Sequence, residues 1–368
     1  MAFVEDTIER ALAAAGLTDR ASQARRAIDA ALVKAGLALR PALQPHAAAQ
    51  FLKEVNGIHV PVLDEQVAQA PAADATPVVP AAGAFTSHTH QGAQGSLAYK
   101  LYVPSSYRGQ ALPLIVMLHG CKQNPDDFAA GTRMNRLAEQ HGFVAAYPAQ
   151  NQRANGGNCW NWFMTAEQQR DGREPSLIAG MVGDITQQLS TNRSKVFAAG
   201  LSAGGAMAVV LGSRYPEIFG GIAVHSGLPL GAARDVPSAF AAMRGHAADD
   251  ASGAAPARGV RTLVLHGDAD KTVAASNGHA VVVQAVAGFE RDGQALNAAT
   301  PVVRTKNGRR SVRTDYVDAS GLAMVRDWRV QGGGHTWFGG SRAGSYTDES
   351  GPDASAELVA FFLGDLPG

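Results

Sequence analysis

A serine flanked by small residues is the first candidate for chemistry, in the run Gly200-Leu201-Ser202-Ala203-Gly204. The run follows an apolar, strand-like segment, Lys195–Ala199, and precedes a helical one, so the serine falls on a sharp turn. Such a turn exposes the hydroxyl, and the N-terminus of the following helix favours negative charge that develops on a reacting carbonyl. The pattern predicts that Ser202 is the nucleophile of an acyl-transfer reaction.

A histidine and two carboxylates follow in the order that this chemistry needs. Asp268 and Asp270 come directly after an apolar run, Thr262–Leu265, and His335 lies in a glycine-rich stretch after the last long run, Ala323–Val330. A general base must remove the serine proton, and an acid must fix the tautomer of that base. The chain order Ser, Asp, His is that of the α/β-hydrolases. We therefore predict that His335 is the base, and these residues alone leave either carboxylate as its partner.

A third motif, His119-Gly120-Cys121, follows the apolar run Leu114–Leu118. In α/β-hydrolases a loop at this place supplies one backbone N–H to the oxyanion hole, and the residue after the nucleophile supplies the other. The amides of Cys121 and Ala203 are therefore the predicted donors. One such donor contributes about 10²–10³ in rate.

The elements that must position these residues alternate along the chain. Apolar runs typical of strands are Leu97–Val103, Leu114–Leu118, Phe143–Tyr147, Val196–Leu201, Gly221–His225, Thr262–Leu265 and Ala323–Val330. Helical patterns cover Asp126–His141, Leu177–Asn192, Ala203–Tyr215, Pro237–Arg244, Ser276–Gly288 and Ser355–Leu363. Short apolar strands that alternate with helices indicate an α/β fold with a mostly parallel sheet, buried on both faces.

The first part of the chain has a different character. Residues 1–56 are predicted to form an N-terminal helical extension, because residues 4–38 carry apolar positions at helical spacing. Residues 57–91 are rich in alanine and proline without any period, which is typical of a linker or an extended strap. The catalytic domain is expected to span residues 92–368, and the extension is a candidate for homodimer contacts.

Charge and hydropathy exclude some partners. Lys+Arg and Asp+Glu are equal at 32 each, which gives no electrostatic reason to expect nucleic acid or an anionic membrane as partner. No apolar run reaches the roughly 18 to 20 residues that span a bilayer. The N-terminus lacks the apolar core of a signal peptide, which predicts a cytoplasmic location. A secreted or periplasmic location is the alternative for a chain whose leader has been removed.

Aromatic side chains accompany the motifs. Trp160, Trp162 and Trp337 lie in loops rather than in strands, and exposed loop tryptophans often contact a ligand, so we predict that they bind substrate. Two other histidines in loop motifs, His119 and His266, are expected to bond the backbone near the site. His225 ends a strand before Ser226-Gly227 and is expected to lie just behind the catalytic residues. The histidines have no metal-ligand spacing, so neither a metal nor an organic cofactor is predicted.

Taken together, the motifs resemble the polyhydroxybutyrate depolymerase esterase family, which includes feruloyl and acetyl-xylan esterase-like members. The matching runs are Leu118-His119-Gly120-Cys121-Lys122-Gln123, Asn158-Cys159-Trp160-Asn161-Trp162-Phe163, Gly200-Leu201-Ser202-Ala203-Gly204-Gly205, His266-Gly267 with Asp270 and Val273, and Gly334-His335-Thr336-Trp337. The resemblance covers roughly residues 92–364 and implies the α/β-hydrolase fold.

The resemblance also implies two pairings that the residues alone leave open. In the family pattern the acid lies two positions past the equivalent of Asp268, which selects Asp270. The two motif cysteines of the family commonly pair, which implies a Cys121–Cys159 disulfide. Without the resemblance, two cysteines are compatible with one disulfide or with two free thiols, and the lack of a visible signal peptide favours the thiols.

The function that the resemblance implies is a serine esterase that forms an acyl-enzyme intermediate. Short-chain hydroxyalkanoate (hydroxybutyrate-type) esters or oligomers are the expected substrates, because the chain ends at Gly368 without the substrate-binding domain of secreted polymer depolymerases. The same triad fits an amide or polyamide hydrolase, such as a poly(aspartic acid) hydrolase, and a feruloyl or acetyl-xylan esterase. A non-catalytic binding protein on a hydrolase fold is the alternative outside enzymes.

Overall fold

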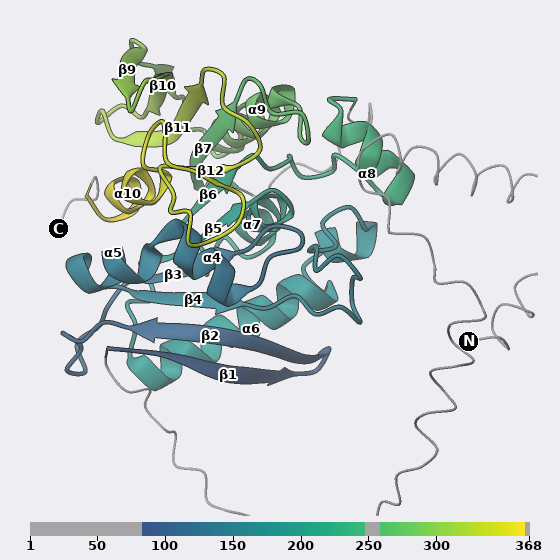
Figure 1. Ribbon diagram of the computed structural model, residues 1–368, viewed down its shortest axis with the longest axis vertical. Coiled ribbons are helices and arrows are strands. Elements are labelled where there is room, and N and C mark those ends of the chain that lie inside the picture. The colour runs from purple at the N-terminus through teal and green to yellow at the C-terminus, as the bar shows by residue number, and fades with distance from the viewer. Residues whose placement is uncertain (1–82, 247–257, 365–368) are drawn as a thin grey trace, which may run out of the picture. The chain divides into compact units, whose positions relative to one another are not determined.

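The computed structural model describes residues 83–246 and 258–364, and these residues build one large mixed sheet with helices on both faces (Figure 1). The strand order is β1-β2-β4-β3-β5-β6-β7-β11-β10-β8, and β9 pairs with β10. The parallel centre of the sheet consists of β4 (Val144–Pro148), β3 (Leu114–Leu118), β5 (Val196–Leu201), β6 (Gly221–His225), β7 (Arg261–Gly267) and β11 (Ala323–Val330). The predicted α/β class and the mostly parallel centre are confirmed.

Antiparallel strands extend the sheet at both edges. One edge holds β1 (Ala84–Gly92) and β2 (Gly95–Val103), and the other holds β8 (Asn297–Ala298), β9 (Val302–Lys306) and β10 (Arg309–Val317). Residues 84–91 were predicted to end a linker or an extended strap that precedes the catalytic domain, but they pair with β2 and belong to the sheet. The rest of that linker, like the predicted helical extension over 1–56, lies outside the described residues.

The helices divide between the two faces of the sheet. They are α4 (Pro125–Thr132), α5 (Met134–His141), η2 (Thr165–Gln168), α6 (Arg173–Leu189), α7 (Ala203–Arg214), α8 (Val236–Met243), α9 (Ala275–Arg291), α10 (Ala354–Val359) and the π-helical turn η4 (Ala360–Gly364). Apolar residues of α6, α7, α8 and α9 share one core cluster, and those of α4, α5 and α10 share the other. Strand β5 serves both cores, because its successive side chains point to opposite faces.

One predicted helix is divided in the structure. Residues 126–141 were expected to form a single helix, but α4 ends at Thr132 and α5 begins at Met134. Arg133 between them has φ 56°, a left-handed conformation that ends a helix. None of the described helices is long and apolar enough to cross a bilayer. The short strands β12 (Trp337–Phe338) and β13 (Thr347–Asp348) pair separately from the main sheet.

Candidate active site

Ser202 occupies the turn between β5 and α7 and has a strained backbone. Its φ and ψ are 57° and −119°, which a non-glycine residue rarely adopts. The turn needs glycine on both sides: a Cβ on Gly200 would lie 2.3 Å from the carbonyl carbon of Gly204, and one on Gly204 would lie 2.1 Å from the carbonyl oxygen of Leu118. This close crossing of strand and helix is the geometry of a nucleophile elbow.

Hydrogen bonds hold the serine in this turn. The amide of Ser202 donates to the carbonyl of His225 at 2.9 Å, and the Ser202 carbonyl accepts from the amide of Ala206 at 3.0 Å. Ser202 retains 9% of its surface exposed, although the strand before it and the helix after it are buried. The elbow therefore presents one residue with an accessible edge at the carboxyl end of the parallel strands, where open α/β sheets bind ligands.

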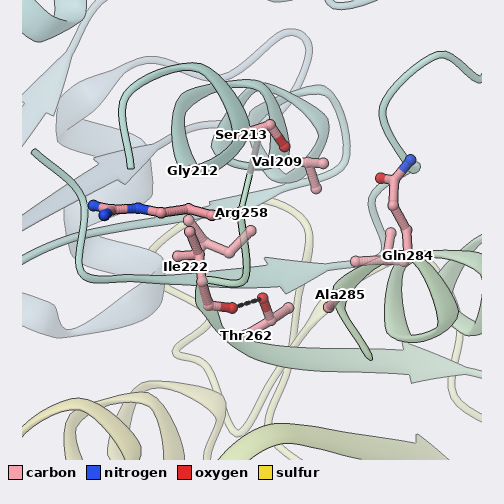
Figure 2. A pocket seen from close by; sticks show the side chains of 10 residues that line it. Val209, Gly212, Ser213, Ile222, Arg258, Thr262, Gln284 and Ala285 are labelled. Atoms are coloured by element: carbon pink, nitrogen blue, oxygen red, sulfur yellow. Dashed lines mark hydrogen bonds between the residues drawn. The ribbon is translucent and has the colours of Figure 1, made fainter. Parts of the chain in front are cut away.

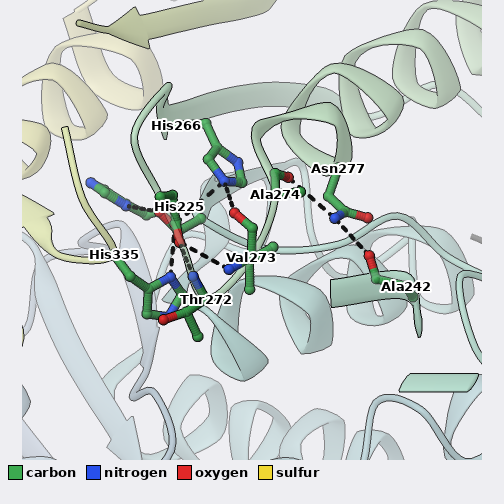
Figure 3. Close-up of polar contacts among 10 residues, drawn as sticks. His225, Ala242, His266, Thr272, Val273, Ala274, Asn277 and His335 are labelled. Carbon is green, nitrogen blue, oxygen red and sulfur yellow. Dashed lines mark hydrogen bonds and ion pairs between the residues drawn. The ribbon is translucent and has the colours of Figure 1, made fainter. Parts of the chain in front are cut away.

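Asp270 and His335 form a direct pair. Nδ1 of His335 lies 2.8 Å from Oδ2 of Asp270, whose side chain is fully buried. Because the carboxylate accepts at Nδ1, that nitrogen carries the proton and Nε2 is left with a lone pair. Figure 3 shows His335 close to Thr272 and Val273, whose amides both donate to the other oxygen of Asp270 at 2.9 Å.

Asp270 is held in its ionised form. Burial acts to raise its pKa, but hydrogen bonds from His266 and His335 and from the amide of Val273 outweigh burial, so the pKa lies below the usual value. Nε2 of His266 lies 3.4 Å from Oδ2 of Asp270 and 2.9 Å from the carbonyl oxygen of Val273. An ionised carboxylate at this place can stabilise an imidazolium that forms on His335.

The other carboxylate of the motif has a different partner. Asp268 is exposed, and its Oδ1 accepts from the amide of Gly332 at 2.6 Å. The amide of Ala269 donates to the carbonyl of Gly333 at 3.0 Å, in the same loop. Asp268 thus fixes the start of the loop that carries His335, whereas Asp270 contacts the imidazole itself.

The loop after β3 lies beside the elbow, because Gly204 packs against the carbonyls of Leu118 and His119. Within the described residues the amide of Cys121 donates to no backbone carbonyl, while the amide of Lys122 donates to Gly157 at 2.7 Å. Ala203 is the first residue of α7, so its amide has no partner within that helix. Both predicted oxyanion donors are thus left available by the backbone.

A covalent bond joins the oxyanion loop to the tryptophan-rich loop. Cys121 and Cys159 form a disulfide across 38 residues of sequence. The indole of Trp160, next to Cys159, donates to the carbonyl of His119 at 3.1 Å. The disulfide that the resemblance implied is present, and it adds to the hydrogen bonds that hold the loop of Cys121.

The tryptophans do not lie as predicted. Trp160 and Trp337 are 0% and 1% exposed, and Trp162 is 6% exposed. Trp160 and Trp162 pack into one core cluster, and Trp337 packs edge-on against Phe128 in the other. The expectation that these residues are exposed was wrong, because a tryptophan in a loop can still point inward and pack in the core. That they bind substrate stays a prediction.

A polar network behind the oxyanion loop was not found from the sequence. The buried carboxylate of Glu174 accepts from the side chain of Gln150 and, at 2.7 Å, from the amide of Asn161. The amide of Gln150 donates to Nε2 of His119 at 3.1 Å, and Nδ1 of His119 donates to the carbonyl of Gly120 at 2.8 Å. The only sequence signal is an isolated glutamate on the apolar side of a helix.

A small, partly open pocket lies apart from these residues (Figure 2). Its volume is about 20 Å³, and it is lined by residues of α7, α9, β6 and β7 that include Val209, Ile222 and Ala285. This volume suffices for about one water molecule. The pocket includes none of the candidate triad residues, and we assign it no chemistry.

The sequence of the chain is similar to those of known depolymerases and esterases. The family model Esterase PHB depolymerase matches residues 97–313. Poly(3-hydroxyalkanoate) depolymerase C of Paucimonas lemoignei is 31% identical over 251 residues, which cover 66% of this chain and 58% of that protein. Acetylxylan esterase A of Talaromyces purpureogenus is 29% identical over 283 residues, 69% of this chain and 70% of that protein. The chain thus spans less than two thirds of the depolymerase.

Among solved structures, an acetyl xylan esterase from Aspergillus awamori superposes with a TM-score of 0.57 at 18% identity. The superposition covers 75% of this chain and 98% of that one. At this identity the likeness shows the fold alone, which is that of the α/β-hydrolases. Because the family match runs over more than half of the sequence, the chain belongs to the PHB depolymerase esterase family.

Proposed function

We propose that the protein is a serine esterase in which Ser202 is the nucleophile, His335 the general base and Asp270 the acid that orients the base. The observation that carries this proposal is the 2.8 Å contact between His335 and a buried, ionised Asp270. The strained elbow at Ser202 supports it, because such strain is kept at functional sites.

The proposed reaction is a two-step acyl transfer. Nε2 of His335 takes the proton of Ser202 Oγ while that oxygen attacks the ester carbonyl carbon. The carbonyl π electrons move to oxygen, which the amides of Cys121 and Ala203 stabilise. The C–O bond of the leaving group then breaks, and the alcohol departs with the proton from His335. Water, deprotonated by His335, attacks the acyl-enzyme in the second step and frees Ser202.

The substrate class that family membership favours is short-chain hydroxyalkanoate esters or oligomers. The match to a poly(3-hydroxyalkanoate) depolymerase supports this choice. A second candidate is an acetyl ester of a polysaccharide, because the match to an acetylxylan esterase covers a larger share of that relative. Both candidates use the same triad and differ in the alcohol that leaves.

The test is steady-state hydrolysis of p-nitrophenyl acetate, butyrate and octanoate beside hydroxybutyrate oligomers, acetylated xylan and poly(aspartate). Ser202→Ala should lower kcat by about 10⁶. Ser213→Ala is the matched control, because Ser213 is buried in the same helix, α7, that begins after Ser202. Activity that survives Ser202→Ala would refute the triad. Cleavage of poly(aspartate) alone would keep the triad and replace the ester by an amide.

A further inference from the structure

His225 ends β6, the strand next to β5, which leads into the proposed nucleophile. Its carbonyl accepts from the amide of Ser202 at 2.9 Å, and in the sheet His225 stands opposite Leu201. Its ring nitrogen Nε2 accepts from the amide of Phe338 at 3.2 Å, three residues after His335. Figure 3 shows His225 and His335 in the same cluster. One residue thus bonds the elbow with its backbone and the base loop with its side chain.

The hydrogen bonds fix the tautomer of this imidazole. Because a backbone amide donates to Nε2, that nitrogen must carry a lone pair, and the proton must be on Nδ1. Nδ1 lies 3.3 Å from the hydroxyl oxygen of Ser226, which accepts that proton. The ring is therefore required in its neutral form, since a second proton would set an N–H against the N–H of Phe338.

The surroundings keep the ring neutral. His225 is 1% exposed and stacks on Trp337 with 5.0 Å between ring centres. Burial lowers its pKa well below the ordinary value, and the nearby His266 and His335 lower it further, against an opposing effect of Asp270. A buried imidazole that stays uncharged can serve as a fixed hydrogen-bond acceptor at working pH.

The loop that carries His335 is consequently held at both ends. At its start, the amide of Gly332 is bound to Asp268, and Gly333 packs against Gly267. At its end, the amide of Phe338 is bound to His225. The first contact fixes the loop relative to the acid, and the second fixes it relative to the strand that also bonds Ser202.

We propose, on the basis of the proposed triad, that His225 is a positioning residue that sets His335 relative to Ser202 through the bond from Phe338. The residue is 1% exposed, so the role proposed for it is not contact with substrate. Its effect on rate comes from geometry, since a misplacement of about 1 Å in a catalytic group costs about 10²-fold. The loss should fall on kcat, while KM, which equals the substrate Kd when acylation limits the rate and is slower than substrate dissociation, stays nearly unchanged.

Three substitutions of His225 test the hydrogen-bond acceptor and the aromatic ring separately. In His225→Gln the amide oxygen can reach the place of Nε2, but the stack on Trp337 is lost. In His225→Asn the shorter side chain reaches only the place of Nδ1, and in His225→Phe the stack stays without an acceptor. With p-nitrophenyl butyrate we expect kcat to fall about 30- to 100-fold for the asparagine and phenylalanine variants, with KM within about twofold. The glutamine variant should lie within about fivefold of the wild type.

The order of the kcat values of the three variants tests the proposal. If His225→Phe is the most active variant, or if all three equal the wild type, the positioning role is refuted. If the phenylalanine variant does not fold, the comparison of glutamine with asparagine still decides, because both lack the ring. Ser202→Ala in the same assay separates the two claims. If Ser202→Ala is inactive and the order of the three variants differs from the expected one, only the role of His225 is refuted. If Ser202→Ala is active, the triad is refuted.

Discussion

Asp270 and Glu174 are both buried carboxylates beside the proposed site, and their environments shift their pKa values in opposite directions. Asp270 pairs with the proposed base, His335, and its pKa lies below the ordinary value because hydrogen bonds from His266 and His335 outweigh the effect of burial. Glu174 lies behind the loop that carries Cys121, and burial raises its pKa to about 7. Its hydrogen-bond donors are the neutral groups of Gln150 and Asn161.

The difference shows that hydrogen bonds from neutral donors only partly offset the rise in pKa that burial causes. The donors of Glu174 lower its pKa, but burial exceeds them and the nearby carboxylate of Glu167 opposes them. Asp270 receives two backbone amides and lies beside two imidazoles, one of which gains a full charge in the proposed reaction. A carboxylate that must stay ionised therefore lies among groups that can carry positive charge, and a structural one does not need them.

Among the effects that test this comparison of the two carboxylates, the largest is expected at Asp270. Asp270→Asn should lower kcat by about 10⁴, because an amide can donate to His335 Nδ1 and stabilise the wrong tautomer. Asp268→Asn is the matched control, since its oxygen can still accept from Gly332, and it should change kcat by only about twofold. Steady-state hydrolysis of p-nitrophenyl butyrate measures both. Equal losses in the two variants would contradict the separate roles given to these carboxylates.

The sequence predicted the parallel strands well, because their apolar runs are short and continuous. It did not predict β1 or β10. Residues 84–92 follow a stretch rich in alanine and proline and lack a clear alternation, and β10 carries three arginines and one aspartate and is largely half-buried. Such strands near the two ends of the sheet owe their place to pairing with a neighbour, which one segment's pattern does not reveal.

The candidate site likewise contains residues that the sequence predicts and contacts that it does not. Ser202, Asp270 and His335 stand in motifs with fixed spacing to strand ends, so the sequence and the family resemblance select them. The link from Glu174 to Asn161 and Gln150 depends on contacts between separate elements, which no local pattern encodes. The burial of the tryptophans also depends on which way a loop folds over the core.

The next largest effect concerns Glu174 and stability. Its pKa is about 7 in the folded protein, against an ordinary value of 4.5, so between these pH values the folded state holds more protons than the unfolded chain. The free energy of unfolding therefore falls as pH rises from 4.5 through 7. The shift corresponds to about 3 kcal/mol. Glu174→Gln removes the titration, so its stability relative to the wild type should increase over this range.

Urea denaturation at a series of pH values measures this difference. Glu290→Gln, an exposed position in α9, is the control for the loss of one carboxylate. Whatever constant cost the glutamine adds by facing the donors of Asn161, it does not vary with pH. Parallel stability curves for Glu174→Gln and the wild type would show that the carboxyl group does not titrate as described.

The smallest effect tests the burial of the tryptophan next to the disulfide loop. Trp162 packs edge-on against Phe163, with 5.8 Å between ring centres, and only 6% of its surface is exposed. Trp162→Phe retains an aromatic pair and loses part of the packing, which should cost about 1 kcal/mol of unfolding free energy. Because the ring serves the core, KM for hydroxybutyrate oligomers should stay within about twofold. A tenfold rise in KM at unchanged stability would instead mean that the side chain contacts substrate. The tryptophan-rich loop, which the disulfide joins to the loop of Cys121, would then contribute to substrate binding.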